Sequence, residues 1–306
     1  MEKFEIRDER FFEVIDPAAE LEVLADGFIF TEGPIWHPTK HWLVFSDIIS
    51  SVQYSWSEQS GLDVFRKPSN MSNGNFFDRE GRIISCEHAT SRLVRHDHDG
   101  RVVKTLASHY NGNELNSPND VVVDTKGRIW FTDPSFGRIR DDVGIPRDCE
   151  LDFQGVYRWD PDGSLTCVVD DFKQPNGLCL SRDEKQLYVN DSADPCIRRF
   201  DIDNAGNLSN DTLWARVEGE QEGRKWVPDG MKVANTDHIF CNGPNGVHLF
   251  DPDGICLGVI QFPEKSTNFC FGGPDRDKLF VTASSRLYCI QTKIDGPAMI
   301  PGFKSV

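Results

Sequence analysis

The sequence lacks the long apolar runs of a membrane protein and the basic excess of a nucleic-acid-binding protein. No window approaches the roughly 18 apolar residues needed to span a bilayer, and the start, MEKFEIRDERFFEVID, has no apolar core of a secretory signal. The formal net charge is −16, whereas phosphates select basic surfaces. We therefore expect a cytoplasmic protein that binds neither nucleic acid nor membrane, and neutral or cationic small molecules remain open as ligands.

Cysteine pairs and the common catalytic motifs are also missing. The nine cysteines include no Cys-x-x-Cys pair, and five of them stand in apolar runs. This usage indicates small buried side chains in a reducing compartment, not disulfides or a zinc site. The sequence contains no Gly-x-Ser-x-Gly elbow, phosphate-binding loop, dinucleotide fingerprint or His-Glu-x-x-His motif. Ordinary nucleophilic and nucleotide-cofactor enzymes are therefore not supported.

A sixfold repeat organises the chain instead. Six times, an oxygen-bearing side chain before an apolar run is followed ten or eleven residues later by a branched apolar residue that opens a second run. The second runs recur every 40 to 58 residues, which is the period of propeller blades with about four strands each. They read HWLVFSD, GRIISCE, GRIWFTD, KQLYVND, DHIFCNG and DKLFVTA. We predict an all-β fold, a single six-bladed β-propeller with four-stranded blades.

The repeats cover nearly the whole chain, so residues 1–306 are expected to form one domain, with residues 1–28 as an N-terminal segment ahead of the first repeat. The last repeat shows only three clear strands, beginning near Asn268. Because an open ring would leave exposed strand edges, residues 20–26 are predicted to supply the fourth strand and close the last blade.

The polar residues that begin the repeats are predicted to meet at one mouth of the central channel, because the inner strands of a propeller surround its axis. Two carboxylates and four amides, with no Lys or Arg among them, are hard oxygen ligands suited to Ca²⁺, whereas Zn²⁺ prefers His or Cys. An ordinary turn role before each strand is the alternative at any single position. The predicted ring consists of Glu32, Asn73, Asn119, Asn176, Asp229 and Asn268.

The motifs around these positions resemble a known family. TEGPIW, SPNDVVVDTKGRIWFTDPSFG, PNGLCLSRDEKQLYVNDS, VPDGMKV and TNFCFGGPDRDKLFVTA are together similar to the gluconolactonase, senescence marker protein and luciferin-regenerating enzyme family, over roughly residues 28–290. SPND and FTDP are typical of its microbial and fungal gluconolactonase branch. The resemblance implies a six-bladed propeller and a divalent-cation-dependent hydrolase that opens sugar lactones such as gluconolactone.

The resemblance also implies the metal ligands, which fall on Glu32, Asn176 and Asp229, with Asn119 as a further ligand or a substrate contact. One ion is expected, most simply Ca²⁺, although Mg²⁺, Mn²⁺ or Zn²⁺ can occupy an oxygen site. The animal senescence marker proteins have a substrate-contacting Arg where this chain has Ser117, so the sugar preference stays open.

Lactone opening at such a site requires a cation, a water molecule and a base. The cation would stabilise the oxyanion that forms during attack on the carbonyl. Calcium lowers the pKa of bound water less than zinc does, so a general base is expected. Asp229 is the predicted base, and the alternative is that Asp229 is a ligand only.

Substrate contacts are predicted for three amides, one imidazole and two aromatic side chains, although core packing is the alternative for the last three. They are Asn73, Asn119, Asn268, His88, Phe136 and Trp226. The irregular stretches 135–154 and 218–226 are typical places for substrate lids. The acidic residues that end the second runs either orient the ring amides or bind loop amides; they are Asp47, Glu87, Asp133 and Asp191.

Two other functions fit the same fold. An organophosphate or aryl ester hydrolase would use the same metal on a different leaving group. A non-enzymatic propeller would bind a partner or calcium alone, since a fold does not dictate activity. The intact Glu32, Asn176 and Asp229 favour the enzyme. The sequence does not decide between a monomer and a dimer.

Overall fold

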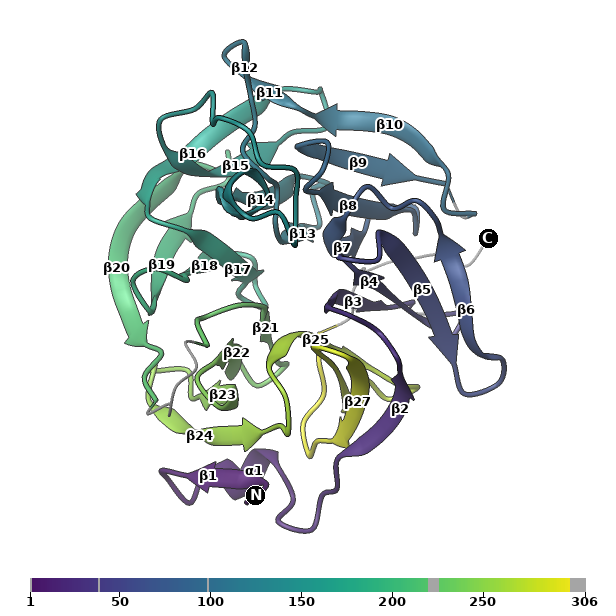
Figure 1. Cartoon of the computed structure of the whole chain (residues 1–306). Helices are drawn as coiled ribbons and strands as arrows, with labels where there is room; N and C mark the ends of the chain where they lie inside the picture. The colour runs from purple at the N-terminus through teal and green to yellow at the C-terminus, as the bar shows by residue number, and fades with distance from the viewer. Residues whose placement is uncertain (1, 38, 98, 220–225, 298–306) are drawn as a thin grey trace.

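The computed structural model arranges six antiparallel blades in a ring around a central axis (Figure 1), which confirms the predicted six-bladed β-propeller. It describes residues 2–37, 39–97, 99–219 and 226–297. In each of the first five blades the chain enters at the innermost strand and proceeds outward by hairpins. Each inner strand therefore begins beside the end of the second strand, because neighbouring strands are antiparallel.

The strands occupy four positions in a blade. The inner strands are β3 (Thr31–Trp36), β7 (Ser72–Phe77), β13 (Val121–Val123), β17 (Pro175–Leu180), β21 (Met231–Val233) and β25 (Ser266–Gly272). The second strands are β4 (Leu43–Asp47), β8 (Ile83–Glu87), β14 (Ile129–Asp133), β18 (Gln186–Asp191), β22 (Ile239–Gly243) and β26 (Lys278–Ala283). The third strands are β5 (Val52–Ser57), β9 (Arg92–His96), β15 (Gln154–Trp159), β19 (Cys196–Ile202), β23 (Gly246–Phe250) and β27 (Arg286–Gln291). The outer strands are β6 (Gly61–Arg66), β10 (Val102–Ala107), β16 (Leu165–Phe172), β20 (Leu208–Arg216), β24 (Cys256–Gln261) and β2 (Glu22–Asp26).

Strand β2 closes the ring as predicted. It pairs antiparallel with β27, with Val23 opposite Tyr288, so the N-terminal segment completes the blade that the C-terminal repeat begins. The first and last blades also share a hydrophobic core, in which the rings of Trp36 and Phe280 stack with their centroids 4.9 Å apart. Burying one such aromatic side chain stabilises a fold by about 1.5–3 kcal/mol.

The N-terminal segment adds two elements that the repeat pattern does not contain. Strand β1 (Phe4–Ile6) pairs with β24 as a fifth strand of the fifth blade, and the short helix α1 (Phe11–Val14) buries Phe11 and Val14 against that blade and the last. The remaining elements are the hairpin of β11 (His109–Tyr110) and β12 (Asn113–Glu114), and helix α2 (Phe136–Ile139). None of the helices within the described ranges is long and apolar enough to cross a membrane.

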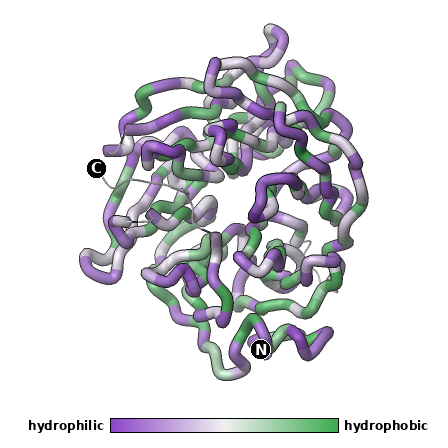
Figure 2. Tube along the Cα trace, turned by 180° about the vertical axis from the view of Figure 1, so that it is seen from behind, coloured by the Kyte–Doolittle hydropathy of each residue, from purple (hydrophilic) through white to green (hydrophobic). Residues whose placement is uncertain are grey.

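Apolar side chains fill the spaces between blades. Many of the outer turns are hydrophilic, as the colouring of Figure 2 shows. The second strands are almost entirely buried because both of their faces meet a neighbouring blade. Outer strands such as β6 are largely exposed. This gradient of burial explains why the second runs were the clearest repeat signal in the sequence.

We propose that residues 1–306 unfold as one cooperative domain, because β2 joins the two ends of the chain in one blade. Deleting residues 1–26 removes β2 and α1 and should abolish the single cooperative transition in thermal unfolding monitored by circular dichroism. Deleting residues 1–9 removes only the edge strand β1 and is the control, expected to keep one transition at a lower midpoint. A cooperative, unchanged melt of the longer deletion would show that ring closure does not depend on β2.

Candidate active site

The six polar residues predicted to form a ring all lie where the inner strands begin, which we call the near end of the axis. Glu32, Asn73 and Asn176 are the second residues of β3, β7 and β17, and Asn268 is the third residue of β25. Asn119 and Asp229 precede β13 and β21 by two residues. All six are between 2% and 6% exposed, so these residues are almost fully buried.

Hydrogen bonds between neighbouring blades join these positions. The N–H of Gly74 donates to the carbonyl oxygen of Asn119 at 2.8 Å, and the side-chain amide of Asn190 donates to the carbonyl oxygen of Asp229 at 2.6 Å. The Thr267 hydroxyl donates to the carbonyl oxygen of Thr31 at 2.6 Å, which joins the last blade to the first. The backbone around the ring is therefore held by contacts from blade to blade.

Glycine follows the ring residue in four repeats because the neighbouring inner strand leaves no room for a side chain. A Cβ at Gly33 would lie 2.2 Å from the carbonyl oxygen of Asn73, and a Cβ at Gly177 would lie 2.1 Å from that of Asp229. Backbone atoms at such distances cannot yield as the end of a flexible side chain can. The recurring pairs Glu-Gly, Asn-Gly and Asp-Gly in the sequence thus mark the closest approach of the inner strands.

Glu32 and Asp229 are a tightly coupled buried pair. Burial raises the pKa of Glu32 well above its usual range, and the charges of Asp229 and Asp120 raise it further. Burial also raises the pKa of Asp229, although the ammonium of Lys265, 3.3 Å from its Oδ2, opposes the rise. Two buried carboxylates repel one another, so they favour a bound cation between them.

Three charged residues beside the ring were not predicted from the sequence. Asp120 follows Asn119 directly and is 2% exposed. The Nζ of Lys232 lies 3.5 Å from Asp120 Oδ2 and 3.0 Å from Asn268 Oδ1. Lys265 contacts Asp229, as described above. The ring itself contains no Lys or Arg, but two ammonium groups border it. Both lysines stand within or beside the repeat motifs VPDGMKV and STNFCFG, which was the signal available in the sequence.

His88 lies beneath the ring and orients Asn73. Its Nδ1 lies 2.8 Å from the carbonyl oxygen of Val143, so Nδ1 carries the proton and Nε2 accepts from the Asn73 side-chain amide at 3.2 Å. Burial lowers the pKa of His88 to about 4, with the charge of Arg140 adding to the effect. Both nitrogens of the neutral imidazole are therefore hydrogen-bonded. Because His88 binds the amide nitrogen of Asn73, the Oδ1 of Asn73 is left buried with no hydrogen-bond partner in the described structure.

Asn268 and Asn176 also have defined orientations. Asn268 Oδ1 accepts from Lys232 Nζ and from the N–H of Phe269 at 2.9 Å, so its amide nitrogen is the group that hydrogen-bonds Glu32. Asn176 donates through its amide nitrogen to Ser192 Oγ at 3.0 Å and also hydrogen-bonds Asp229. Asn268 therefore supports a carboxylate, whereas Asn176 joins the fourth blade to Asp229 of the fifth.

The near end fits a divalent cation by its donor chemistry. The part of the chain that the structure describes holds no group of three or more His, Cys, Asp or Glu side chains that could bind a metal. A cation at the near end would therefore need amide oxygens beside the Glu32 and Asp229 carboxylates. The buried, unpartnered Asn73 Oδ1 shows that this end has an acceptor that the protein itself does not use, and mixed carboxylate and amide sets are what Ca²⁺ accepts.

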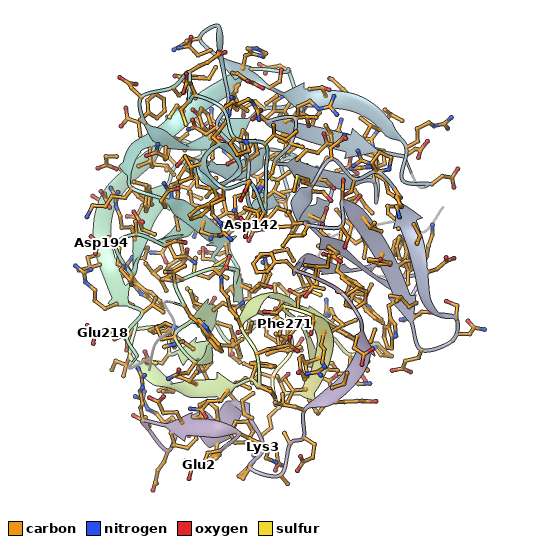
Figure 3. The ribbon with its side chains drawn as sticks, viewed as in Figure 1. Glu2, Lys3, Asp142, Asp194, Glu218 and Phe271 are labelled. Atoms are coloured by element: carbon orange, nitrogen blue, oxygen red, sulfur yellow. The ribbon has the colours of Figure 1, made fainter. Side chains whose placement is uncertain are left out.

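The stretch 135–154 covers the second and third blades at the near end. A Cβ at Gly137 would lie 2.8 Å from Cβ of Ser117 and 2.9 Å from Cβ of His88, so α2 rests directly on both residues. The buried Arg138 secures it by donating to the carbonyl oxygens of Asn116 at 2.8 Å and Leu115 at 2.5 Å. Figure 3 shows Asp142 of this stretch at the inner side of the circle of blades.

This packing involves two residues named above. Ser117 is fully buried, and its hydroxyl forms two hydrogen bonds within the protein. It donates to the carbonyl oxygen of Pro134 and accepts from the N–H of Gly137. Phe136, the first residue of α2, is half-buried. The substrate contact predicted for Phe136 stays a prediction, while Ser117 holds the 135–154 stretch in place.

Trp226 lies at the other side of the near end. It lines an open cavity of about 870 Å³ with Ser192 and Val217. Because Ser192 binds Asn176, this cavity adjoins the ring. Of the predicted lid at 218–226, residues 220–225 lie outside the described residues.

The acidic residues at the ends of the second strands bind the loops that lead into the inner strands. Asp47 accepts the N–H groups of Ile29 and Phe30, and Asp191 accepts those of Lys173 and Gln174. Asp133 accepts the N–H of Asn116 at 2.8 Å. Glu87 pairs instead with Arg66 and Arg92 and with Asn70. For Asp47, Asp133 and Asp191 these contacts support the second of the two roles considered, binding loop amides, whereas Glu87 forms ion pairs.

The family profile described as SMP-30/Gluconolactonase/LRE-like region matches residues 30–285. A gluconolactonase of Zymomonas mobilis is 31% identical over 301 residues, which cover 92% of this chain and 84% of the relative. The pentonolactonase XacC of Haloferax volcanii is 28% identical, with coverage of 83% and 81%. The solved structure of XC5397 from Xanthomonas campestris, named a gluconolactonase, superposes with a TM-score of 0.86 at 33% identity and covers 95% of this chain and 94% of that one.

Asp133, which binds the loop before β13, predicts how the stability of the fold depends on pH. Burial raises the pKa of Asp133 to about 7 from 3.8, and its Oδ1 has no partner among the described residues. The folded state therefore retains a proton that the unfolded state releases, so this group costs stability as the pH rises from about 4 to 7, by roughly 1–4 kcal/mol at about 1.4 kcal/mol per pKa unit. Asp133→Asn cannot ionise. Its gain in stability over the parent, measured by urea unfolding, should grow across this range and be largest above pH 7.

Asp191→Asn is the matched control. Asp191 has the same place in the fourth blade, but both of its oxygens accept N–H groups, so its replacement should destabilise the fold without a comparable gain at high pH. A difference between Asp133→Asn and the parent that stays constant from pH 4 to 8 would contradict the raised pKa.

Proposed function

This chain belongs to the SMP-30/Gluconolactonase/LRE-like family and is a lactonase, and we propose that it opens sugar lactones at the near end with one divalent cation, Ca²⁺ first among them. Glu32, Asn176, Asp229 and Asn119 are the proposed ligands. One observation carries the proposal: two coupled, buried carboxylates face one another among amides at the end of the axis, in a chain similar to enzymes named for gluconolactone and pentonolactone.

A divalent cation held by these residues would stabilise the negative charge that grows on the lactone carbonyl oxygen. The protein's own part is to supply a base. Burial raises the pKa of Asp229, the Lys265 ammonium opposes that rise by stabilising the carboxylate, and in its ionised form Asp229 can accept a proton from the attacking water. Glu32 is held by the N–H of Gly33 at 2.8 Å and by Asn268, and we assign it the role of a charged ligand.

Substrate binding is assigned to the groups around this pair. Asn73 Oδ1, kept free by His88, can accept a hydrogen bond from a sugar hydroxyl. The low pKa of His88 and its two hydrogen bonds make it a positioning residue for Asn73, not the base. Phe136 from the 135–154 cover and Trp226 from the opposite cavity provide apolar faces on which a sugar ring can stack. Asn119 completes the proposed contacts.

The first test is a substrate panel. Proton release should be rapid with gluconolactone and pentonolactones and slow with aryl and phosphoryl esters. A chelator should abolish the activity, and adding back Ca²⁺ should restore it.

Glu32→Gln and Asp229→Asn should weaken calcium binding in calorimetry, because each removes one of two anionic ligands. The exposed Glu58→Gln is the matched control and should bind as the parent does. Equal calcium affinity in all four proteins would exclude the near end as the metal site.

The second test separates the base from the ligand. In saturating Ca²⁺, Asp229→Asn should still lose about 10²-fold or more in kcat, the usual contribution of a general base. Glu32→Gln at full occupancy should lose much less, because it removes a ligand but no proton acceptor. Equal recovery of the two variants would make Asp229 a ligand only.

A further inference from the structure

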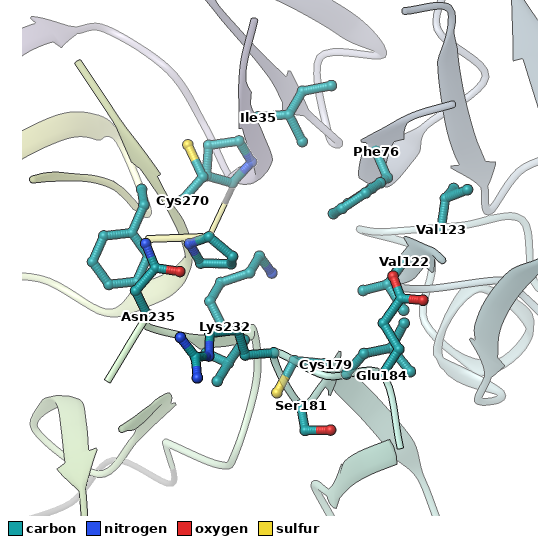
Figure 4. A pocket seen from close by; sticks show the side chains of 16 residues that line it. Ile35, Phe76, Val122, Val123, Cys179, Ser181, Glu184, Lys232, Asn235 and Cys270 are labelled. Atoms are coloured by element: carbon teal, nitrogen blue, oxygen red, sulfur yellow. The ribbon is translucent and has the colours of Figure 1, made fainter. Parts of the chain in front are cut away.

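A second pocket lies at the opposite end of the axis, where the inner strands finish. Its cavity volume is about 230 Å³. All six blades contribute residues that follow the ring residues along their inner strands (Figure 4), including Ile35, Phe76, Val122, Cys179, Lys232 and Phe271. Neither the metal nor the lactone of the proposed function uses this far-end pocket.

The walls of the far-end pocket are mainly apolar. Side chains such as Ile35, Phe76 and Val122 offer no hydrogen bonds to a sugar. Burial raises the pKa of the Cys179 thiol to about 12, so this group stays protonated and weakly polar. A ligand of this pocket must therefore present an apolar body, unlike the polyhydroxylated substrate of the near end.

Lys232 places a positive charge in this apolar space. Its side chain is 15% exposed and extends into the cavity, as Figure 4 shows. Nζ donates to Asn268 Oδ1 at 3.0 Å and lies 3.5 Å from Asp120 Oδ2. An ammonium group has three N–H donors. Besides these two side chains, Nζ lies over the Phe269 ring, 5.9 Å from its centroid, and within the described chain it has no third hydrogen-bond acceptor. The other cation at the pocket, Arg182, lies at the exposed rim.

The same lysine links the two ends of the axis. Asn268 accepts from Lys232 and in turn hydrogen-bonds Glu32, the proposed calcium ligand. The ion pairs and hydrogen bonds described above involve three carboxylates and two ammonium groups: Glu32, Asp120, Asp229, Lys232 and Lys265. A bound divalent cation reverses their surplus from one negative to one positive charge, which favours an anion beside Lys232.

We propose that the far-end pocket is a second binding site, for a small monocarboxylate with an apolar body, and that this ligand and the divalent cation strengthen each other's binding through Lys232, Asn268 and Glu32. The carboxylate pairs with the free N–H of Lys232, and the apolar body fills the space between Ile35, Phe76 and Val122. The binding site stands on its own geometry, whereas the coupling rests on the proposed function, since it requires the cation at the near end. Thermodynamic linkage makes the coupling reciprocal.

Benzoate is the probe, because its charge and apolar ring match the pocket, and benzamide is the neutral control of the same shape. In calorimetry with calcium-loaded protein, benzoate should bind with a Kd in the millimolar range or tighter, and benzamide at least roughly tenfold more weakly, because it lacks the charge-assisted hydrogen bond. Equal affinity for the two compounds, or no binding of benzoate, overturns the site. The lactone and chelator tests of the proposed function are unaffected by that failure.

Two variants locate the binding. Lys232→Met keeps the apolar stem but removes the charge and should weaken benzoate binding roughly tenfold or more. The exposed Lys185→Met is its matched control and should bind benzoate as the parent does. Val123→Phe fills the pocket while keeping Lys232, so it tests the site even if Lys232→Met fails to fold. Benzoate affinity unchanged in Val123→Phe would place the ligand elsewhere, including on the calcium ion itself, and overturns the proposal.

The coupling has its own readout. Chelated parent protein should bind benzoate more weakly than calcium-loaded protein by about fivefold, the low end of the usual range for coupled sites, and benzoate should raise calcium affinity by the same factor. Val123→Phe should bind calcium but show no benzoate effect on it. Equal benzoate affinity with and without calcium overturns the coupling, while the binding to Lys232 is judged by the variants above.

Discussion

The close approach of the six inner strands is the constraint on which the rest of the structure depends. Gly33 and Gly177 stand where a Cβ would collide with the carbonyl oxygen of the next blade, and hydrogen bonds from blade to blade join the same positions. This tight packing brings the first residues of each inner strand to one place and excludes water from them. Polar side chains there lose their solvation and must satisfy one another or bind a ligand.

The charges gathered in this way explain the chemistry of both ends. Glu32 and Asp229 are too close and too buried to share the site as uncompensated anions, so Lys265 supports one of them and a cation is favoured beside both. Lys232 meets Asp120 and Asn268 from the far end. A single row of contacts thus runs along the axis. Through it, a change of charge at the near end alters the affinity of the far-end pocket for an anion.

The 135–154 insertion shows how the third blade adapts the common framework. It rests on Ser117 and His88, and Arg138 ties it to the loop before β13. Its carbonyl oxygen at Val143 fixes the imidazole, and the imidazole fixes Asn73. The loop therefore acts on the site through orientation as well as by covering it, which is why His88 serves Asn73 and carries no charge at neutral pH.

The sequence by itself determined the six blades, the closing strand near residues 20–26 and the positions of the ring, because each depends on a local pattern that recurs along the chain: a polar residue, an apolar run and a turn. The tertiary structure alone decided the partners of those residues. That Lys232 and Lys265 border the ring, that Asn268 turns its oxygen to a lysine, and that Asp133 keeps an unpartnered oxygen all depend on contacts between residues distant in sequence. Strand periodicity predicts which residues share a face of a strand. The distance between the faces of different blades is set only when the circle of blades closes.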